Sequence, residues 1–202
     1  MKKLLFIVPA LLLFSFITAD NTLSKKERKS AASLLKDTES GVLNSVKGLS
    51  DAQLKYKPAP DRWSVEECLK HIAISEQMIW GMIDNTMKQP ANPDKRIDIK
   101  VTDDDIIKRL EDRSTKIKTM DPLKPENTPF TSAADALASF KDNRGKLIDY
   151  VKKTQDDLRD HIASLPIGTY DCYQLILLIG AHSNRHTQQI EEVKADPNFP
   201  KN

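Results

Sequence analysis

Residues 175–186 read LILLIGAHSNRH, and this stretch is the strongest indication of the fold class. Residues 175–181 are almost wholly apolar, and a helix that is apolar on most sides is buried among other elements. Pro166 and Gly168 break the chain ahead of this stretch. The pattern therefore predicts a buried helix over about residues 169–195.

Three further long helices are expected to pack with this one. Apolar residues recur at helical spacing over residues 22–47, over 64–84, and from near residue 132 past Leu158. Ser64 and Glu67 form a capping box, which marks the start of the second of these helices. A shorter amphipathic helix is expected over residues 102–118.

The composition also favours helices. The chain has 6 glycines in 202 residues, and 6% of its residues are aromatic. Scarce glycine and few aromatic residues argue against a β-sandwich. No alternating run predicts a strand, and the proline-containing segments 49–63, 85–101 and 119–130 are expected to be loops. We therefore predict an all-α fold, a four-helix bundle with one extra short helix.

Residues 1–19 have the pattern of a signal peptide. Lys2 and Lys3 precede an apolar run over residues 4–17, and cleavage after Ala19 fits the pattern. The predicted mature domain is 20–202, in the periplasm or secreted, with no stable membrane span once the signal is removed. The alternative is an uncleaved N-terminal membrane anchor, although the apolar run is short for a bilayer span.

The charge balance argues against a nucleic-acid partner. The chain has 31 basic and 29 acidic residues, and removing residues 1–19 takes away two lysines, so the predicted mature domain has 29 of each. A neutral chain has no electrostatic reason to follow phosphate backbones. The expected partner is a small-molecule substrate of unknown identity, and a homodimer remains open.

Two histidines of the last helix are four residues apart. His182 and His186 are separated by about 40° of rotation and about 6 Å of rise, so both imidazoles can reach one ion. Such a pair alone is more often two hydrogen-bonded histidines than a metal site.

A third histidine changes this balance. His71 lies near the middle of the second helix, and three neutral imidazoles from facing helices suit Zn²⁺, Ni²⁺ or Fe²⁺. Three protein ligands also leave one coordination position for water or substrate. We therefore predict one divalent metal ion on His71, His182 and His186. His161 is expected to be a surface histidine at the end of the third helix.

Two segments resemble a known family. Residues 63–73 read WSVEECLKHIA and residues 180–190 read GAHSNRHTQQI, which resemble the WS…H and H-x-x-R-H-x-x-Q-I motifs of the DinB-like (DinB/YfiT) family. Residues 49–54, followed by Pro58 and Pro60, are similar to the loop ahead of the first motif. The likeness covers roughly residues 28–196.

The resemblance implies a bundle with a long crossover between its second and third helices, and a divalent metal on the same three histidines. Members with known roles include thiol-dependent transferases, isomerases and proposed metal hydrolases. The chain is therefore expected to be an exported, metal-dependent hydrolase or transferase. The alternatives are a non-catalytic metal- or small-molecule-binding bundle, and a structural domain with a vestigial histidine set.

Other residues near the site carry two interpretations each. Glu67 is either a general base or the capping partner of Ser64, and the cap is favoured. Gln189 either orients a ligand histidine or satisfies a buried contact. Cys68 and Cys172 are expected to remain free thiols, because a shared ion would hold them about 10 Å or more apart along the helices.

Overall fold

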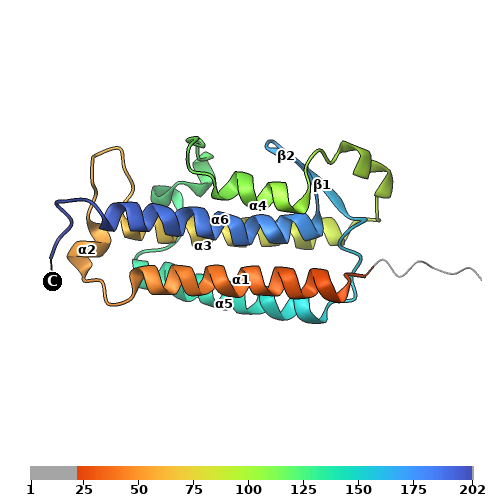
Figure 1. Ribbon diagram of the computed structural model, residues 1–202, viewed down its shortest axis with the longest axis horizontal. Helices are drawn as coiled ribbons and strands as arrows, with labels where there is room; N and C mark the ends of the chain where they lie inside the picture. The colour runs from red at the N-terminus through yellow and green to blue at the C-terminus, as the bar shows by residue number, and fades with distance from the viewer. Residues whose placement is uncertain (1–21, 202) are drawn as a thin grey trace, which may run out of the picture.

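A computed structural model describes residues 22–201 and has the predicted four-helix bundle (Figure 1). The four long helices are α1 (Lys25–Val46), α3 (Val65–Met87), α5 (Ala133–Lys153) and α6 (Cys172–Lys194). The predicted signal peptide, residues 1–19, lies outside the described residues. Within residues 22–201, no helix combines the length and the apolar character needed to cross a bilayer.

A polar side chain caps the start of each long helix, although α1 and α6 each begin three residues later than predicted, at Lys25 and Cys172. Ser24, Ser64, Ser132 and Asp171 each accept a hydrogen bond from a backbone N–H of the first turn. Such caps satisfy N–H groups that have no partner inside the helix. At the other end of α1, Gly48 has φ of +76° and turns the chain out of the helix.

The order of the helices around the bundle requires a long connection. α1 packs against α5 and α6, and α3 packs against the same two helices. Figure 1 shows α3 and α5 running in the same direction, opposite to α1 and α6. Because neighbouring parallel helices cannot be joined by a short turn, the chain crosses the length of the bundle between α3 and α5. The predicted crossover is confirmed.

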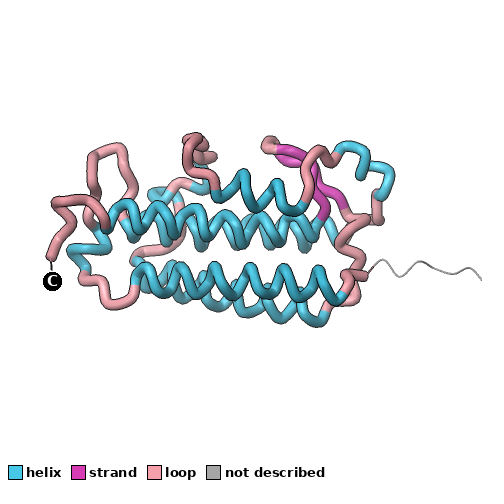
Figure 2. The backbone as a smooth tube through the Cα atoms, viewed as in Figure 1, coloured by secondary structure: helices cyan, strands magenta, loops and turns pink. Residues whose placement is uncertain are grey.

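This crossover contains most of the remaining structure. It holds the 3₁₀ turns η1 (Pro93–Asp98), η2 (Asp121–Leu123) and η3 (Pro125–Asn127), and the helix α4 (Asp103–Glu111). α4 is the predicted extra short helix, and it packs along α6 on the outside of the bundle (Figure 1). The loops that connect these pieces are pink in Figure 2.

The bundle core consists of two apolar clusters with a polar layer between them. One cluster contains Leu35, Ile79, Leu147 and Ile176, and the other contains Val42, Leu69, Phe140 and Ile190. Along every long helix, a buried polar residue separates the two sets. These residues are Thr38, Glu76, Arg144 and Ser183.

Two parts of the structure differ from the sequence prediction. The third long helix ends at Lys153, and Leu158, predicted to continue its stripe, is buried from the loop that follows. Strands β1 (Ile162–Leu165) and β2 (Gly168–Asp171) then form an antiparallel hairpin, although no strand was expected. Four-residue strands are too short to show a reliable alternation.

Two further details, the end of α4 and the segment 49–63, also differ from the sequence prediction. α4 ends at Glu111, although its prediction extended to residue 118. The segment 49–63, predicted to be a loop, contains the short helix α2 (Asp51–Lys55), which begins at a Ser50 capping box with Gln53. These corrections lie outside the four-helix core.

Candidate metal centre

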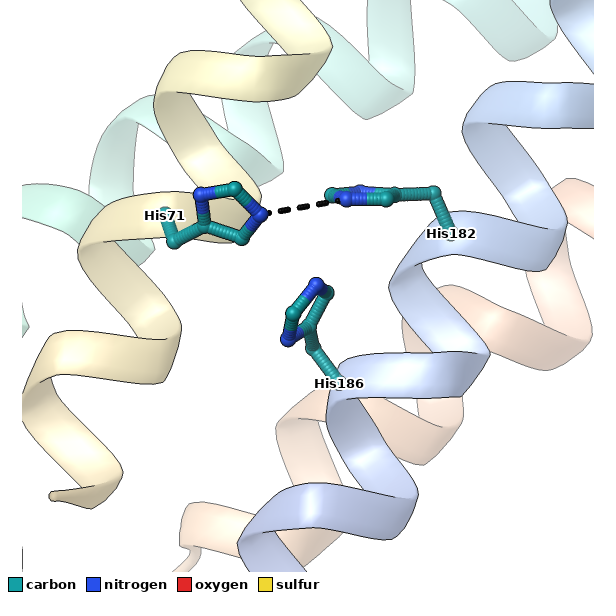
Figure 3. Close-up of side chains that lie close together, drawn as sticks. All are labelled: His71, His182 and His186. Atoms are coloured by element: carbon teal, nitrogen blue, oxygen red, sulfur yellow. Dashed lines mark hydrogen bonds between the residues drawn. The ribbon is translucent and has the colours of Figure 1, made fainter. Parts of the chain in front are cut away.

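The three predicted ligand histidines lie together. His71 comes from α3, and His182 and His186 come from consecutive turns of α6 (Figure 3). One ring nitrogen of each residue lies within 4.8 Å of the other two, and the Nε2 atoms of His71 and His182 are 3.2 Å apart. The structure therefore brings together the residues that the sequence singled out.

Two of the imidazoles are fixed from outside the cluster. His71 Nδ1 donates to the carbonyl oxygen of Leu123 at 2.7 Å, and His186 Nδ1 donates to Oε1 of Gln189 at 2.9 Å. Because these outer nitrogens carry the protons, the Nε2 atoms of the neutral rings keep their lone pairs. This is the arrangement by which ligand histidines are usually oriented. Of the two roles considered for Gln189, the structure supports the orienting one.

Burial keeps the three rings uncharged. It lowers the pKa of His71, against the raising effect of the bond to Leu123. It also places the pKa values of His182 and His186 well below their usual range, where the charges of neighbouring histidines lower them further. Neutral imidazoles are the form that binds a metal.

The donor set fits a divalent ion. Zn–N bonds of about 2.0–2.1 Å set tetrahedral ligand nitrogens roughly 3.4 Å apart, close to the separation of His71 and His182. Within residues 22–201, the cluster contains three histidines and no carboxylate or thiol. Three histidines are the number of protein ligands that leaves one position of a tetrahedral site open.

A buried hydroxyl lies one helical turn beyond His71. Ser75 is 1% exposed, and its Oγ has no hydrogen-bond partner within the described part of the chain. Residues four apart on a helix share a face, so the Ser75 hydroxyl lies on the same face of α3 as His71, one turn further along. No motif in the sequence indicates this hydroxyl.

Two other candidates, Glu67 and His161, have structural roles. Glu67 accepts from the backbone N–H of Ser64 at 2.7 Å and from Lys57 at 2.9 Å, so the capping interpretation is confirmed. His161 lies in the loop before β1, where its ring nitrogens bond backbone carbonyls. The prediction that His161 lies at the end of the third helix is therefore wrong, because α5 ends at Lys153.

Both cysteines are buried free thiols, as predicted. Burial raises the pKa of Cys68 far above its usual range, which keeps the thiol protonated although it lies one turn from His71. Neither cysteine joins the cluster of ligand atoms.

Trp63 covers one side of the histidines. Its ring lies 4.8 Å from that of His71 and is stacked on His186 at 5.8 Å, centroid to centroid. The position of Trp63 immediately before the Ser64 cap places its ring beside the histidine cluster.

Residues 112–123, named here the crossing segment, follow α4 in the chain and end with η2. At one end, Arg185 of α6 donates to the carbonyls of Leu110, Asp112 and Thr115. At the other end, the carbonyl of Leu123 accepts from His71. The segment therefore ties both histidine-bearing helices together from outside the bundle.

Comparisons with known proteins agree with this description. A model of the DinB superfamily matches residues 34–190. The uncharacterized protein YuaE of Bacillus subtilis (strain 168) is 27% identical over 152 residues, which cover 75% of this chain and 89% of YuaE. YfiT from Bacillus subtilis, described as a probable metal-dependent hydrolase with an unusual four-helix bundle topology, has a similar structure. The TM-score is 0.59, the identity is 15%, and the match covers 89% of this chain and 92% of YfiT.

Proposed function

Because the chain belongs to the DinB superfamily, we propose that it is a metal-dependent hydrolase that binds one divalent ion through His71, His182 and His186. The observation that carries the proposal is the convergence of three neutral imidazoles without a fourth protein ligand in the described part of the chain. A site with three protein ligands is typical of catalytic rather than structural metal centres. The description of YfiT as a probable metal-dependent hydrolase supports the same reaction class.

The residues around the cluster have distinct roles in this proposal. When bound, the ion supplies Lewis acidity that lowers the pKa of a water molecule. Leu123 and Gln189 hold two imidazoles in the ligand tautomer. Trp63 excludes solvent from the face of His186, and His182 is the partly exposed member through which a substrate approaches.

Two other functions remain candidates for the same site. A thiol would also suit the remaining coordination position, which would make the protein a thiol-dependent transferase. The burial of His71 and His186, which are 4% and 7% exposed, favours instead a non-catalytic metal-binding bundle. Metal identity among Zn²⁺, Ni²⁺ and Fe²⁺ follows from the experiment below.

The experiment is metal analysis followed by activity assays. Protein purified without added metal is expected to contain about one divalent ion per chain. His186→Ala should lose it, and His161→Ala, which changes a histidine outside the cluster, should retain it. Metal-loaded protein is then tested on ester, amide and phosphoester substrates and on thiol-transfer substrates. Wild-type metal content in His186→Ala would refute the site, and a metal site without turnover would favour the binding bundle.

We also propose that the protein acts outside the cytoplasm. The basic and apolar pattern of residues 1–19 supports this proposal, and the balanced charge of residues 20–202 supports a small-molecule rather than a nucleic-acid partner. N-terminal sequencing of the native protein should give a start near Asp20. An intact Met1 in a soluble cytosolic fraction would contradict the export proposal.

A further inference from the structure

Two arginines meet one carboxylate beside the metal-binding face. Arg113, in the crossing segment, donates through Nε and Nη2 to the two carboxylate oxygens of Glu192, each at 2.7 Å. Arg62 donates to the same carboxylate at 3.4 Å. Arg62, Arg113 and Glu192 are named here the arginine edge.

The arginine edge is adjacent to the histidine cluster. Arg113 also donates to the carbonyl oxygen of Arg185 at 3.4 Å, directly before His186. Arg62 precedes Trp63, whose ring is stacked on that of His186. The arginine edge is therefore connected to both sides of His186, through the Arg185 carbonyl and through Trp63.

Positive charge is in excess at this place. Arg185 is 6% exposed and bonds three backbone carbonyls, and within residues 22–201 no carboxylate lies within ion-pair distance of it. The guanidinium groups of Arg62, Arg113 and Arg185 thus have two carboxylates near them: that of Glu192, which accepts from Arg62 and Arg113, and that of Asp112, whose charge acts on Arg185.

The histidine cluster adds to this excess once it holds an ion. Its ligands are neutral, so they leave the charge of a divalent ion uncompensated. Buried or partly buried charges of one sign favour a ligand of the opposite sign. A guanidinium held in a fixed plane also matches the two oxygens of a carboxylate or phosphate group.

We propose that the arginine edge binds an oxyanion group, carboxylate or phosphate, of the small-molecule substrate, and that Glu192 occupies this subsite until the substrate arrives. The assignment of the ligand as substrate rests on the proposed metal-dependent function, whereas the subsite itself does not. The side chains of Arg62, Arg113 and Glu192 are 41%, 19% and 45% exposed, so a solute can reach them. Glu192 is a replaceable partner, because half-exposed ion pairs contribute little to stability.

The proposal predicts that two substitutions change the affinity for an anion in opposite directions. Glu192→Gln removes the competing carboxylate, so it should strengthen binding of inorganic phosphate or acetate. Arg113→Gln removes a guanidinium, so it should weaken binding. The expected change is about tenfold in each direction, which corresponds to about 1.4 kcal/mol. Arg109→Gln, which removes an exposed arginine of α4 from outside the edge, should leave binding unchanged.

The measurement is calorimetric titration of each variant with inorganic phosphate and, separately, with acetate. Both metal-free and metal-loaded protein are used, after circular dichroism has verified that each variant is folded. The order Glu192→Gln, wild type, Arg113→Gln from tightest to weakest, in either form, supports the subsite. The probe that shows the larger difference identifies phosphate or carboxylate as the preferred group.

Equal affinities for all variants in both forms would overturn the proposal. A destabilised fold cannot account for the tighter binding expected of Glu192→Gln. Wild-type protein that binds no metal but keeps the predicted order would refute the metal-dependent function and leave the subsite supported. Normal metal binding together with equal anion affinities for all variants would refute the subsite and leave the metal-dependent function supported.

Discussion

Arg144 donates to both carboxylate oxygens of Glu76, at 2.9 and 2.7 Å, and the two side chains are 0% and 2% exposed. The same guanidinium donates to the Leu35 carbonyl, to Thr38 Oγ1 and to Ser183 Oγ. One buried side chain therefore contacts all four long helices. Since Glu76 shares α3 with His71 and Ser183 follows His182, this layer fixes the helix alignment on which the histidine cluster depends.

Removing one member of this pair should be strongly destabilising. Glu76→Ala leaves the Arg144 charge buried without its partner, and such changes cost about 3–5 kcal/mol. Replacing both residues by apolar side chains of similar size, as in Glu76→Leu with Arg144→Met, should recover most of that loss. Urea unfolding followed by circular dichroism measures both. A single variant as stable as wild type would contradict this account.

Gln189 should tune metal affinity. Gln189→Ala removes the acceptor that orients His186, and loss of such a partner typically weakens metal binding about 10–100-fold. Gln188→Ala is the matched control, because Gln188 bonds the Glu111 carbonyl of α4 instead. Competition with a metal-sensitive dye measures the affinities. Equal losses in the two variants would mean that α6 is merely loosened.

Metal-free protein should lose stability on mild acidification. Burial lowers the pKa of His71, His182 and His186 in the folded state, whereas in the unfolded chain they titrate near about 6.5. Below that pH the unfolded chain binds more protons, so the free energy of unfolding falls as the pH falls. The contribution is fully present above about pH 6.5 and changes by up to about 1.4 kcal/mol per pH unit for each histidine.

Urea unfolding at several pH values between about 5 and 7.5 measures this slope. His182→Asn should make it shallower, since one titrating ring is gone. If the free energy of unfolding depends on pH equally in wild type and in His182→Asn, His182 does not contribute to the loss of stability in acid.

Gly180 should not tolerate a side chain. A Cβ atom there would lie 2.8 Å from Leu34 Cγ, because α1 and α6 approach closely at this point. Gly180→Ala is therefore expected to cost about 1–3 kcal/mol through overpacking. Gly145→Ala on α5 is the control, because its Cβ meets nothing within 4 Å, and it should stabilise by about 0.5–1 kcal/mol. Thermal unfolding distinguishes the two, and a neutral Gly180→Ala would contradict the close approach.

The histidine cluster could be predicted because its information is local. His182 and His186 are one turn apart on a helix whose period is clear, and Ser64 fixes where the helix of His71 begins. Family resemblance then indicated which helices face each other. The capped start of α3 was readable for the same reason.

The polar layer and the arginine edge depend on long-range contacts. Glu76 and Arg144 look like ordinary charged residues in a chain that is 30% charged, and only the packing of α3 against α5 makes them partners. Arg113 was expected inside a helix, but the chain leaves α4 at Glu111, where Arg185 binds the carbonyls that follow. The end of α5 was misjudged because Leu158 happens to continue its apolar spacing.

The crossing segment can affect access to the site separately from the stability of the bundle. It borders the histidine cluster, yet Ile117 and Met120 within it are 57% and 48% exposed and take no part in the bundle core. Insertions, deletions or exchanges at residues 116–120, between the ends that contact Arg185 and His71, would reshape access to the site while the four helices and their ligands stay intact. Related proteins could therefore acquire new substrates through sequence changes in this one loop. They would keep the same helical bundle and differ in the compounds that reach the site.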